Sequence, residues 1–236
     1  MSSILHSFIK NIDITKYLNH HAVTLLASVG AYYLTKQYLM TPLVGLWRHL
    51  LRPRKNLVKR YGSQWAVVTG ASDGIGEQYC YELAKSGFNI ILVSRTLDKL
   101  ERVARVLRDQ YKVDTRIVQF DFATLNSTEK VAELYSLLDR HSDLDVAILA
   151  NNAGKAHMNF IHDHAVDMCF NMVNVNVNAV LFVAHYYLAR FKERFDKHGK
   201  RSAVINVSSI GGIAPSAKTT IYAGTKAFDR IFSLGM

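Results

Sequence analysis

The feature that most constrains the fold of this chain is a glycine-rich turn between a short strand and a helix. Residues 65–69 (WAVVT) are a β-branched run typical of a buried strand, and the turn 70–76 (GASDGIG) follows directly. Residues 77–85 then predict a helix, with Gly87 as its stop signal. Such a turn lets the backbone approach a pyrophosphate, whose charge then lies at the helix N-terminus. The sequence therefore predicts a dinucleotide site at the start of an α/β fold.

The rest of the chain alternates strand-like runs with amphipathic helices. Residues 97–107, for example, place apolar side chains on one helical face, with charged side chains opposite. This alternation is typical of an α/β fold with a doubly wound parallel sheet of the Rossmann type. The predicted strands are Trp65–Thr69, Asn89–Val93, Thr115–Phe120, Val146–Ala150 and Ala203–Val207.

Three side chains near the end of the chain have a spacing suited to reducing a carbonyl group. If the segment from Ile221 is helical, Tyr222 and Lys226 share one face at i and i+4. An ammonium beside a phenol can lower the phenol pKa by roughly 1–3 units, towards the range where a general acid works best. Ser209 ends a predicted strand, where its hydroxyl can hold a substrate carbonyl oxygen while Tyr222 protonates it. By itself, this spacing also fits an alternative in which the Tyr and the Lys are an ordinary exposed pair on a helix.

A third element is Asn151-Asn152-Ala153-Gly154, which closes an apolar run. In chain order, the strand, the glycine turn, the helix, this Asn-Asn-Ala-Gly loop, Ser209 and Tyr222-x-x-x-Lys226 resemble the short-chain dehydrogenase/reductase family. The resemblance covers residues 62–236. It implies an oxidoreductase in which Tyr222 is the proton donor and Ser209 orients the substrate carbonyl. Lys226 would bind the cofactor ribose and perturb the phenol.

The same resemblance places the family's proton-relay asparagine at Asn176. Asn174 and Asn178 stand at alternate positions beside it, so the three could instead form one polar helix face. The cofactor-binding residues that the resemblance implies are Gly70, Ser72, Asp73, Gly74, Ile75, Gly76, Arg95, Asp121, Asn151, Asn152, Gly154, Tyr222 and Lys226.

The end of the second predicted strand indicates which nicotinamide cofactor is used. An NAD site usually has an acidic residue about 20 positions past the glycines, bonded to the ribose 2′-hydroxyl. Ser94-Arg95-Thr96 stands there instead, and a guanidinium suits a 2′-phosphate. We therefore expect the cofactor to be NADP(H) and the reaction to run in the reductive direction. The alternative is that Arg95 is a solvated arginine at the end of a strand, without a role in binding. By resemblance, Asp121 would lie near the adenine.

Charge and cysteine content narrow the function further. The formal net charge is +10, yet residues 1–60 alone hold nine Lys or Arg and one acidic residue. Residues 61–236 are thus nearly neutral, which argues against a nucleic-acid partner. Cys80 and Cys169 fit no metal-ligand spacing and suggest a reducing compartment. The loop histidines at 157, 162 and 164 lack a matching cysteine or carboxylate set, so we expect no metal site.

The basic excess belongs to an N-terminal segment, residues 1–60, which we expect to associate with a membrane through an apolar helix. Ala22–Leu34 is uncharged but only about 20 Å long as a helix, too short for a hydrocarbon core of about 30 Å. If the helix is extended to Trp47, it includes the charged Lys36 and the helix-breaking Pro42. A basic block follows, which tends to stay cytosolic and attracts anionic lipid. A soluble amphipathic helix pair is the alternative.

A closer resemblance comes from this N-terminal arrangement followed by Tyr61-Gly62-x-x-Trp65 and the glycine turn. It points to the branch of 17β-hydroxysteroid dehydrogenases and very-long-chain 3-oxoacyl-CoA reductases, including the hydroxysteroid dehydrogenase-like proteins. Ser94-Arg95 and Asp121-Phe122-Ala123 also match that branch, whereas Ala150 departs from its usual valine. The resemblance implies an endoplasmic reticulum membrane protein with a cytosolic catalytic domain, or alternatively a mitochondrial one.

The resulting hypothesis is an NADPH-dependent, membrane-associated reductase of a ketone on a lipid-like carbonyl substrate. A steroid 17-ketone and a long-chain 3-oxoacyl-CoA both fit, and a homodimer is left open. The competing hypothesis is a non-catalytic relative that binds the cofactor or dimerises. The family has seven parallel strands, and residues 61–236 provide five before the sequence ends at Met236. We therefore expect a C-terminally incomplete domain whose fifth strand is an edge, and a chain that is a fragment or has little activity.

Overall fold

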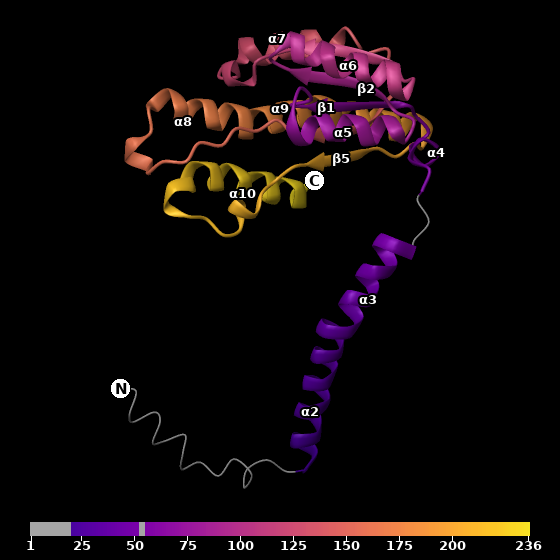
Figure 1. Ribbon diagram of the computed structural model, residues 1–236, viewed down its shortest axis with the longest axis vertical. Helices are drawn as coiled ribbons and strands as arrows, with labels where there is room; N and C mark the ends of the chain where they lie inside the picture. Colours follow the sequence, from indigo (N-terminus) through magenta and orange to yellow (C-terminus); the bar gives the residue numbers. More distant parts are fainter. Residues whose placement is uncertain (1–19, 52–54) are drawn as a thin grey trace. The chain divides into compact units, whose positions relative to one another are not determined.

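The computed structural model describes residues 20–51 and 55–236 (Figure 1). The chain divides into two compact units, Met1–Lys55 and Asn56–Met236. The predicted membrane segment extends over residues 1–19 and 52–54 as well, and that part of the prediction lies outside the described residues.

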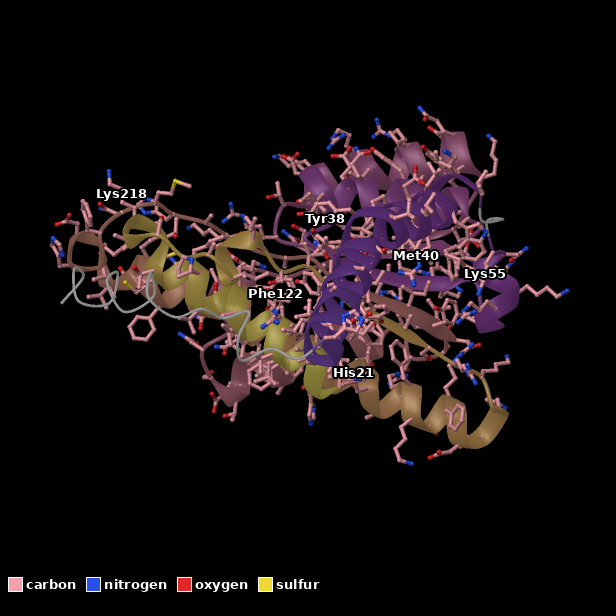
Figure 2. The ribbon with its side chains drawn as sticks, turned by 90° about the horizontal axis from the view of Figure 1, so that it is seen from below. His21, Tyr38, Met40, Lys55, Phe122 and Lys218 are labelled. Carbon is pink, nitrogen blue, oxygen red and sulfur yellow. The ribbon has the colours of Figure 1, made fainter. Side chains whose placement is uncertain are left out.

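The described part of the first unit is helical. It comprises α2 (His20–Leu34), η2 (Thr35–Met40), α3 (Thr41–Leu46) and η3 (Trp47–Leu51). The π-helical step η2 precedes Pro42, which has no N–H to donate, and the Thr41 hydroxyl donates to the Lys36 carbonyl at 2.8 Å. His21, Tyr38 and Met40 lie along this helix (Figure 2).

The first unit exposes apolar side chains, with Leu25 65% and Tyr38 75% accessible. An apolar helix therefore forms where the sequence predicted one, while its attachment to a membrane stays a prediction. Within the described residues, the helix with the length and hydropathy of a membrane span is Val166–His198, in the second unit. Its buried residues Val183 and Tyr187 belong to the core of that unit, so its composition reflects a core helix.

The second unit is built on a five-stranded parallel sheet with the order β3-β2-β1-β4-β5. The chain runs outward from β1 through β2 to β3, then returns to place β4 and β5 on the other side of β1. This reversal makes the doubly wound topology that the sequence predicts, with its switch point between β1 and β4. The strands are β1 (Trp65–Thr69), β2 (Asn89–Ser94), β3 (Thr115–Gln119), β4 (Val146–Asn151) and β5 (Ala203–Asn206).

Helices cover both faces of the sheet (Figure 1). One core cluster joins the sheet to α7 and α9, and the other joins it to α5 and α6. Along β1, Val67 belongs to the first cluster, whereas Ala66 and Val68 belong to the second. Because alternate residues of a strand point to opposite faces, burial on both sides explains the continuous apolar runs.

The helices of this unit, in chain order, are α4 (Leu57–Tyr61), α5 (Gly74–Lys85), α6 (Leu97–Tyr111), η4 (Phe122–Thr124), α7 (Thr128–Asp139), η5 (Ile161–Asp163), α8 (Val166–Val173), η6 (Asn174–Asn178), α9 (Ala179–His198), η7 (Ile210–Gly212), η8 (Ala217–Thr219) and α10 (Thr220–Gly235). The helix after the glycine turn begins at Gly74, three residues earlier than predicted, because the Asp73 side chain accepts a hydrogen bond from the Gly74 amide at 2.8 Å.

A buried arginine ties together the amino ends of several elements. Arg194 of α9 is 6% exposed and donates to the Asp145 carboxylate, just before β4. It also donates to the carbonyls of Tyr61, at the end of α4, and of Arg201, before β5. These hydrogen bonds connect the start of the second unit to the amino ends of its strands.

Candidate active site

A cavity of about 500 Å³ lies at the carboxyl ends of the strands, where the topology switches direction. Its walls come from the turns that follow β1, β2, β3, β4 and β5, together with α10. The predicted site residues that line it are Gly70, Ser72, Asp73, Ile75, Arg95, Asp121, Asn152, Gly154, Tyr222 and Lys226. With Val175 of η6, which also lines the pocket, the fold gathers residues from seven separate segments of sequence.

The glycine turn after β1 is held in close contact with the loop after β4. Gly70 has a φ of +66°, a conformation that favours glycine. A Cβ on Gly76 would lie 2.1 Å from the Gly70 carbonyl oxygen and 2.4 Å from Nδ2 of Asn152. That Nδ2 donates to the Thr69 carbonyl at 3.1 Å. Gly76 therefore shapes the turn without lining the pocket, and the exposed backbone of Gly74 begins the helix that follows.

The two asparagines after β4 have different surroundings. Asn152 lines the pocket, and its backbone amide donates to the Thr69 hydroxyl at 3.0 Å. Asn151 is 1% exposed and donates through Nδ2 to Oδ1 of Asn206 at 3.0 Å. Among the described residues, Oδ1 of Asn151 has no hydrogen-bond partner. Asn151 therefore lies below the pocket floor, and its predicted contact with a cofactor stays a prediction.

Arg95 lies exposed at the end of β2 and lines the same pocket as the glycine turn. Beside it, Ser72 of the turn and Ser94 of β2 are joined through their hydroxyl oxygens at 2.9 Å. Lys99 donates to Asp73 at 2.8 Å, which holds the pKa of that carboxyl below its usual range. The charge of Lys99 is therefore balanced by Asp73, and the exposed guanidinium of Arg95 is the group beside the turn that suits a phosphate.

A second ion pair supports the turn from α6. Arg102 donates to both carboxylate oxygens of Glu77 at 2.8 Å and to the carbonyl of Ser72 at 3.3 Å. These bonds hold the pKa of Glu77 below its ordinary value, with a further contribution from the Tyr81 hydroxyl. The sequence reasoning did not identify Arg102, because its contact with a residue 25 positions earlier depends on α5 packing against α6.

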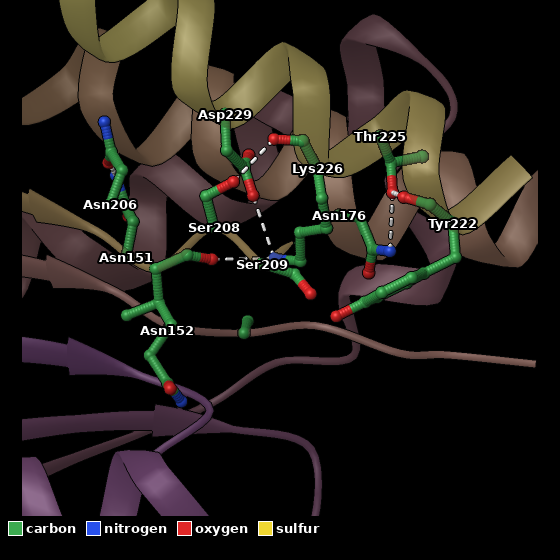
Figure 3. Close-up of polar contacts among 12 residues, drawn as sticks. Asn151, Asn152, Asn176, Asn206, Ser208, Ser209, Tyr222, Thr225, Lys226 and Asp229 are labelled. Atoms are coloured by element: carbon green, nitrogen blue, oxygen red, sulfur yellow. Dashed lines mark hydrogen bonds and ion pairs between the residues drawn. The ribbon is translucent and has the colours of Figure 1, made fainter. Parts of the chain in front are cut away.

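Tyr222 and Lys226 lie one helical turn apart on α10, as predicted, and both line the pocket (Figure 3). Ser209 comes close to Tyr222 across Gly211. A Cβ on Gly211 would lie 3.5 Å from both the Ser209 Oγ and a ring carbon of Tyr222. The Ser209 Oγ accepts from the Gly211 amide at 3.1 Å, which leaves its hydroxyl hydrogen available to a substrate oxygen.

The ammonium of Lys226 is buried and already paired. Its Nζ donates to the carbonyl of Val207 and to Oδ2 of Asp229, each at 2.8 Å. No hydrogen bond joins it to Tyr222 among the described residues. Asp229 was not predicted as a site residue, although it follows Lys226 by three residues. Charged pairs at i and i+3 are usually exposed to solvent, so the spacing alone gave no reason to single it out.

Asn176 is fully buried behind the pocket in the π-helical turn η6. Its Oδ1 accepts from the amide of Lys155 at 2.7 Å, and its Nδ2 donates to the Thr225 hydroxyl at 2.9 Å. Asn174 and Asn178 instead donate to backbone carbonyls of residues 123 and 125. The three asparagines therefore do not form one polar helix face. Asn176 is the one that contacts α10 beside Tyr222.

Several pocket-lining residues were not identified from the sequence, namely Ser94, Phe120, Phe122, Lys155, Val175, Val207 and Ser208. Most are apolar or small and carry no motif of their own. His157 and His164 lie in edge-on contact, with ring centroids 5.2 Å apart. In the part of the chain that the structure describes, no three His, Cys, Asp or Glu side chains form a group that could hold a metal ion.

The family model for short chain dehydrogenases matches residues 64–236. A very-long-chain 3-oxoacyl-CoA reductase of Scheffersomyces stipitis is 36% identical over 192 residues, covering 78% of this chain and 54% of the relative. The human protein named inactive hydroxysteroid dehydrogenase-like protein 1 is 36% identical over 186 residues, covering 78% of this chain and 53% of the relative. The chain therefore spans about half the length of these curated relatives.

The structure of a short-chain dehydrogenase from Sphingobium yanoikuyae in complex with NADPH is similar in fold. It aligns with a TM-score of 0.63 and 29% identity, over 72% of this chain and 63% of that one.

Proposed function

Because this chain belongs to the short-chain dehydrogenase family, we propose that it is an NADP(H)-dependent oxidoreductase that reduces the ketone of a lipid-like substrate. The observation that carries the proposal is the pocket itself, which contains the glycine turn, Arg95, Tyr222 and Lys226 together. The similarity to a 3-oxoacyl-CoA reductase supports the reaction type, and the NADPH-bound relative supports the cofactor.

The pocket residues fit a dinucleotide with a 2′-phosphate. The turn after β1 is packed so closely that a Cβ at Gly76 would collide with the Gly70 carbonyl oxygen, and it leads into α5, whose N-terminus favours a phosphate charge. Arg95 would pair with the 2′-phosphate, and Asp121 would lie at the adenine end. Lys226 would hold the nicotinamide ribose. When bound, NADP(H) would supply the hydride.

The proton would come from Tyr222. Its phenol lines the pocket, and the nearby Ser209 hydroxyl would donate to the substrate carbonyl oxygen and hold it for protonation. Asn176 would act from behind the pocket, where it fixes Lys155 and the α10 turn that carries Tyr222. Tyr222 is carried by the half-buried helix α10, and Ser209 lies in the loop after β5, as the cap of η7. This placement suits a general acid, which needs a fixed geometry.

The substrate would be apolar. Side chains of the loops on either side of the pocket expose large apolar surfaces, with Met158 74%, Ile210 81% and Ile213 70% accessible. Such exposed apolar groups are typical of a surface that receives a lipid-like molecule. They fit a steroid and a long acyl chain equally, so we propose the class and leave the choice to the assay below.

We further propose that residues 1–60 associate with the endoplasmic reticulum membrane and leave residues 61–236 as a cytosolic reductase domain. The exposed apolar helix of the first unit and the basic residues after it support this placement. The relative from Scheffersomyces stipitis is named for a very-long-chain acyl-CoA, and a lipid-like substrate of this kind is compatible with a membrane location. The mitochondrion is the alternative compartment, and a homodimer is compatible with this proposal.

The test is NADPH consumption by the purified chain with two substrates, a long-chain 3-oxoacyl-CoA and a steroid 17-ketone. We expect turnover with one or both, in contrast to the low activity that the five predicted strands alone suggested, because Tyr222 and Lys226 line one pocket with the glycine turn. Tyr222→Phe should retain NADPH binding, measured by cofactor fluorescence, and lose about 10²–10⁴-fold in kcat because a general acid contributes that much. Turnover that is unchanged in Tyr222→Phe would contradict the assigned proton donor.

A second candidate function is a cofactor-binding protein without turnover. The human relative is named inactive, and the ammonium of Lys226 is already paired with a carboxylate in this chain. In this case NADPH would bind with normal affinity while neither substrate would be reduced. The same assay thus separates the two functions.

A further inference from the structure

A buried carboxylate lies against the lysine of the proposed active site. Asp229 follows Lys226 by three residues on α10, and its Oδ2 lies 2.8 Å from the ammonium Nζ. Figure 3 shows the two side chains against each other, joined by a dashed line. Asp229 is 0% and Lys226 6% exposed, so solvent does not screen this pair. Surface pairs of this spacing contribute little, but a dehydrated pair depends strongly on both partners.

The donors of Lys226 can be accounted for one by one. An ammonium has three N–H groups. One is directed at the Val207 carbonyl and one at Asp229, each at 2.8 Å. The ammonium also borders the pocket across Gly154, where a Cβ would lie 3.4 Å from Nζ. One N–H therefore remains for a group bound in the pocket, with its direction fixed by the other two.

Among the described residues, Asp229 is the carboxylate within ion-pair distance of this ammonium. From the end of β5, the groups that contact α10 here are the Val207 carbonyl and the Ser208 hydroxyl, which donates to the Lys226 carbonyl at 2.6 Å. From η6 the neighbour is the amide of Asn176. The other charged side chains that line the pocket are Arg95, Lys155, Asp73 and Asp121. Among the described residues, the ion pairs of Lys226 comprise Asp229 alone.

Burial of the Asp229 carboxylate is energetically unfavourable. Burial raises the pKa of Asp229, while the hydrogen bond and charge of Lys226 act in the opposite direction. Among the described residues, its Oδ1 has no hydrogen-bond partner. A buried, half-satisfied carboxylate destabilises a fold more than an apolar side chain of the same size. A role as packing alone does not explain its presence.

We infer that Asp229 is a positioning residue for Lys226, a role that rests on the proposed function. Its carboxylate compensates the charge of the buried ammonium. With Val207, it also fixes the direction of the remaining N–H towards the cofactor ribose. Removal of the carboxylate would leave the ammonium buried without its ion-pair partner, which is unfavourable for a charged amine.

The variant that tests this role is Asp229→Asn, which keeps the size and one oxygen acceptor but removes the charge. Ser233→Ala is the matched control on the same helix. Its hydroxyl donates to the Asp229 backbone carbonyl at 2.6 Å and does not touch the ion pair. Two readouts are compared: the rate at which acetic anhydride acetylates Lys226 in the cofactor-free chain, followed by mass spectrometry, and kcat with a ketone substrate.

We expect acetylation of Lys226 in Asp229→Asn to be at least about tenfold faster than in the native chain. Loss of the carboxylate disfavours the charged ammonium, and the neutral amine is the form that acetic anhydride acetylates. We expect kcat to fall at least about tenfold, with the substrate KM changed less than about twofold, since the contact proposed for the lysine is with the cofactor and not with the substrate. Ser233→Ala should leave both within about twofold. Unchanged acetylation and kcat in a folded Asp229→Asn would overturn the role.

Two further outcomes remain decisive. If the native chain shows no turnover while Asp229→Asn is acetylated faster, the proposed function fails and the charge-holding role stands. If Asp229→Asn does not fold, Asp229→Glu replaces it, because it keeps the charge and moves it by one methylene. A fall in kcat with unchanged NADPH affinity would then support positioning. A native kcat in Asp229→Glu would overturn it.

Discussion

Replacement of Gly76 by alanine should damage both the stability of the sheet domain and its cofactor site. The new Cβ would lie 2.1 Å from the Gly70 carbonyl oxygen, whereas ordinary contact begins at 3.4 Å. The colliding group is backbone, so no side-chain rotation can relieve the contact. The glycine turn and the start of α5 would have to separate by about 1 Å.

The magnitude follows from two contributions. Overpacking in a closely packed region costs about 1–3 kcal/mol. The Cβ would also displace Nδ2 of Asn152, 2.4 Å away, which donates to the carbonyls of Thr69 and Gly70. Each lost hydrogen bond costs about 1 kcal/mol. The free energy of unfolding should therefore fall by about 3–5 kcal/mol, a large share of the 5–15 kcal/mol typical of a domain.

The assay is urea unfolding followed by circular dichroism, together with NADPH binding by fluorescence. Gly224→Ala is the control. It lies on the exposed side of α10, with nothing within 4 Å of the new Cβ, and should stabilise the helix by about 0.5–1 kcal/mol. Gly76→Ala should bind NADPH at least about tenfold more weakly, because the turn opens. An unfolding free energy within about 1 kcal/mol of the native value would refute this reasoning.

Three other predictions concern charge and attachment. Arg95→Asp should weaken NADPH binding at least about tenfold and favour NADH, as measured by paired titrations; an unchanged NADPH affinity would remove the argument for a 2′-phosphate contact. The pKa of Glu77 is depressed by Arg102, so this pair stabilises the fold above pH 4.5 and the contribution is lost as the pH falls. Unfolding of Glu77→Gln should therefore depend less on pH in the acid range, and equal slopes would contradict this. The full chain should sediment with membranes and resist high-salt extraction, whereas deletion of residues 1–48 should release it; a native chain that stays in the supernatant would count against the anchor.

The sequence was sufficient wherever a local pattern determined the structure. The strand of residues 65–69 lies where it was predicted, because a β-branched run is a local signal. The glycine turn follows it directly but is shorter than predicted, since α5 begins at Gly74. The i, i+4 spacing of Tyr222 and Lys226 likewise placed both on one helical face. The alternation of strands and helices predicted a doubly wound parallel sheet, which the strand order confirms.

The sequence was insufficient where contacts join distant segments. Asn174 and Asn178 have the spacing of a polar face, but η6 is a π-helical turn, and both asparagines bind carbonyls about 50 residues earlier. The pairing of Arg102 with Glu77 depends in the same way on helix packing. Asp229 shows a further limit. Its spacing was visible, but only the burial of α10 turns an ordinary pair into an unscreened one.

The tie made by Arg194 has a practical consequence for how this chain can be handled. It joins the carbonyl of Tyr61 to residues directly before β4 and β5, at the sheet end opposite the pocket. A mechanical force applied to the chain before Asn56 is therefore transmitted to the starts of several strands and not directly to the pocket loops. Coupling to a bead or an electrode through a tag before Asn56 should leave the pocket mouth open, with mechanical load borne by the core.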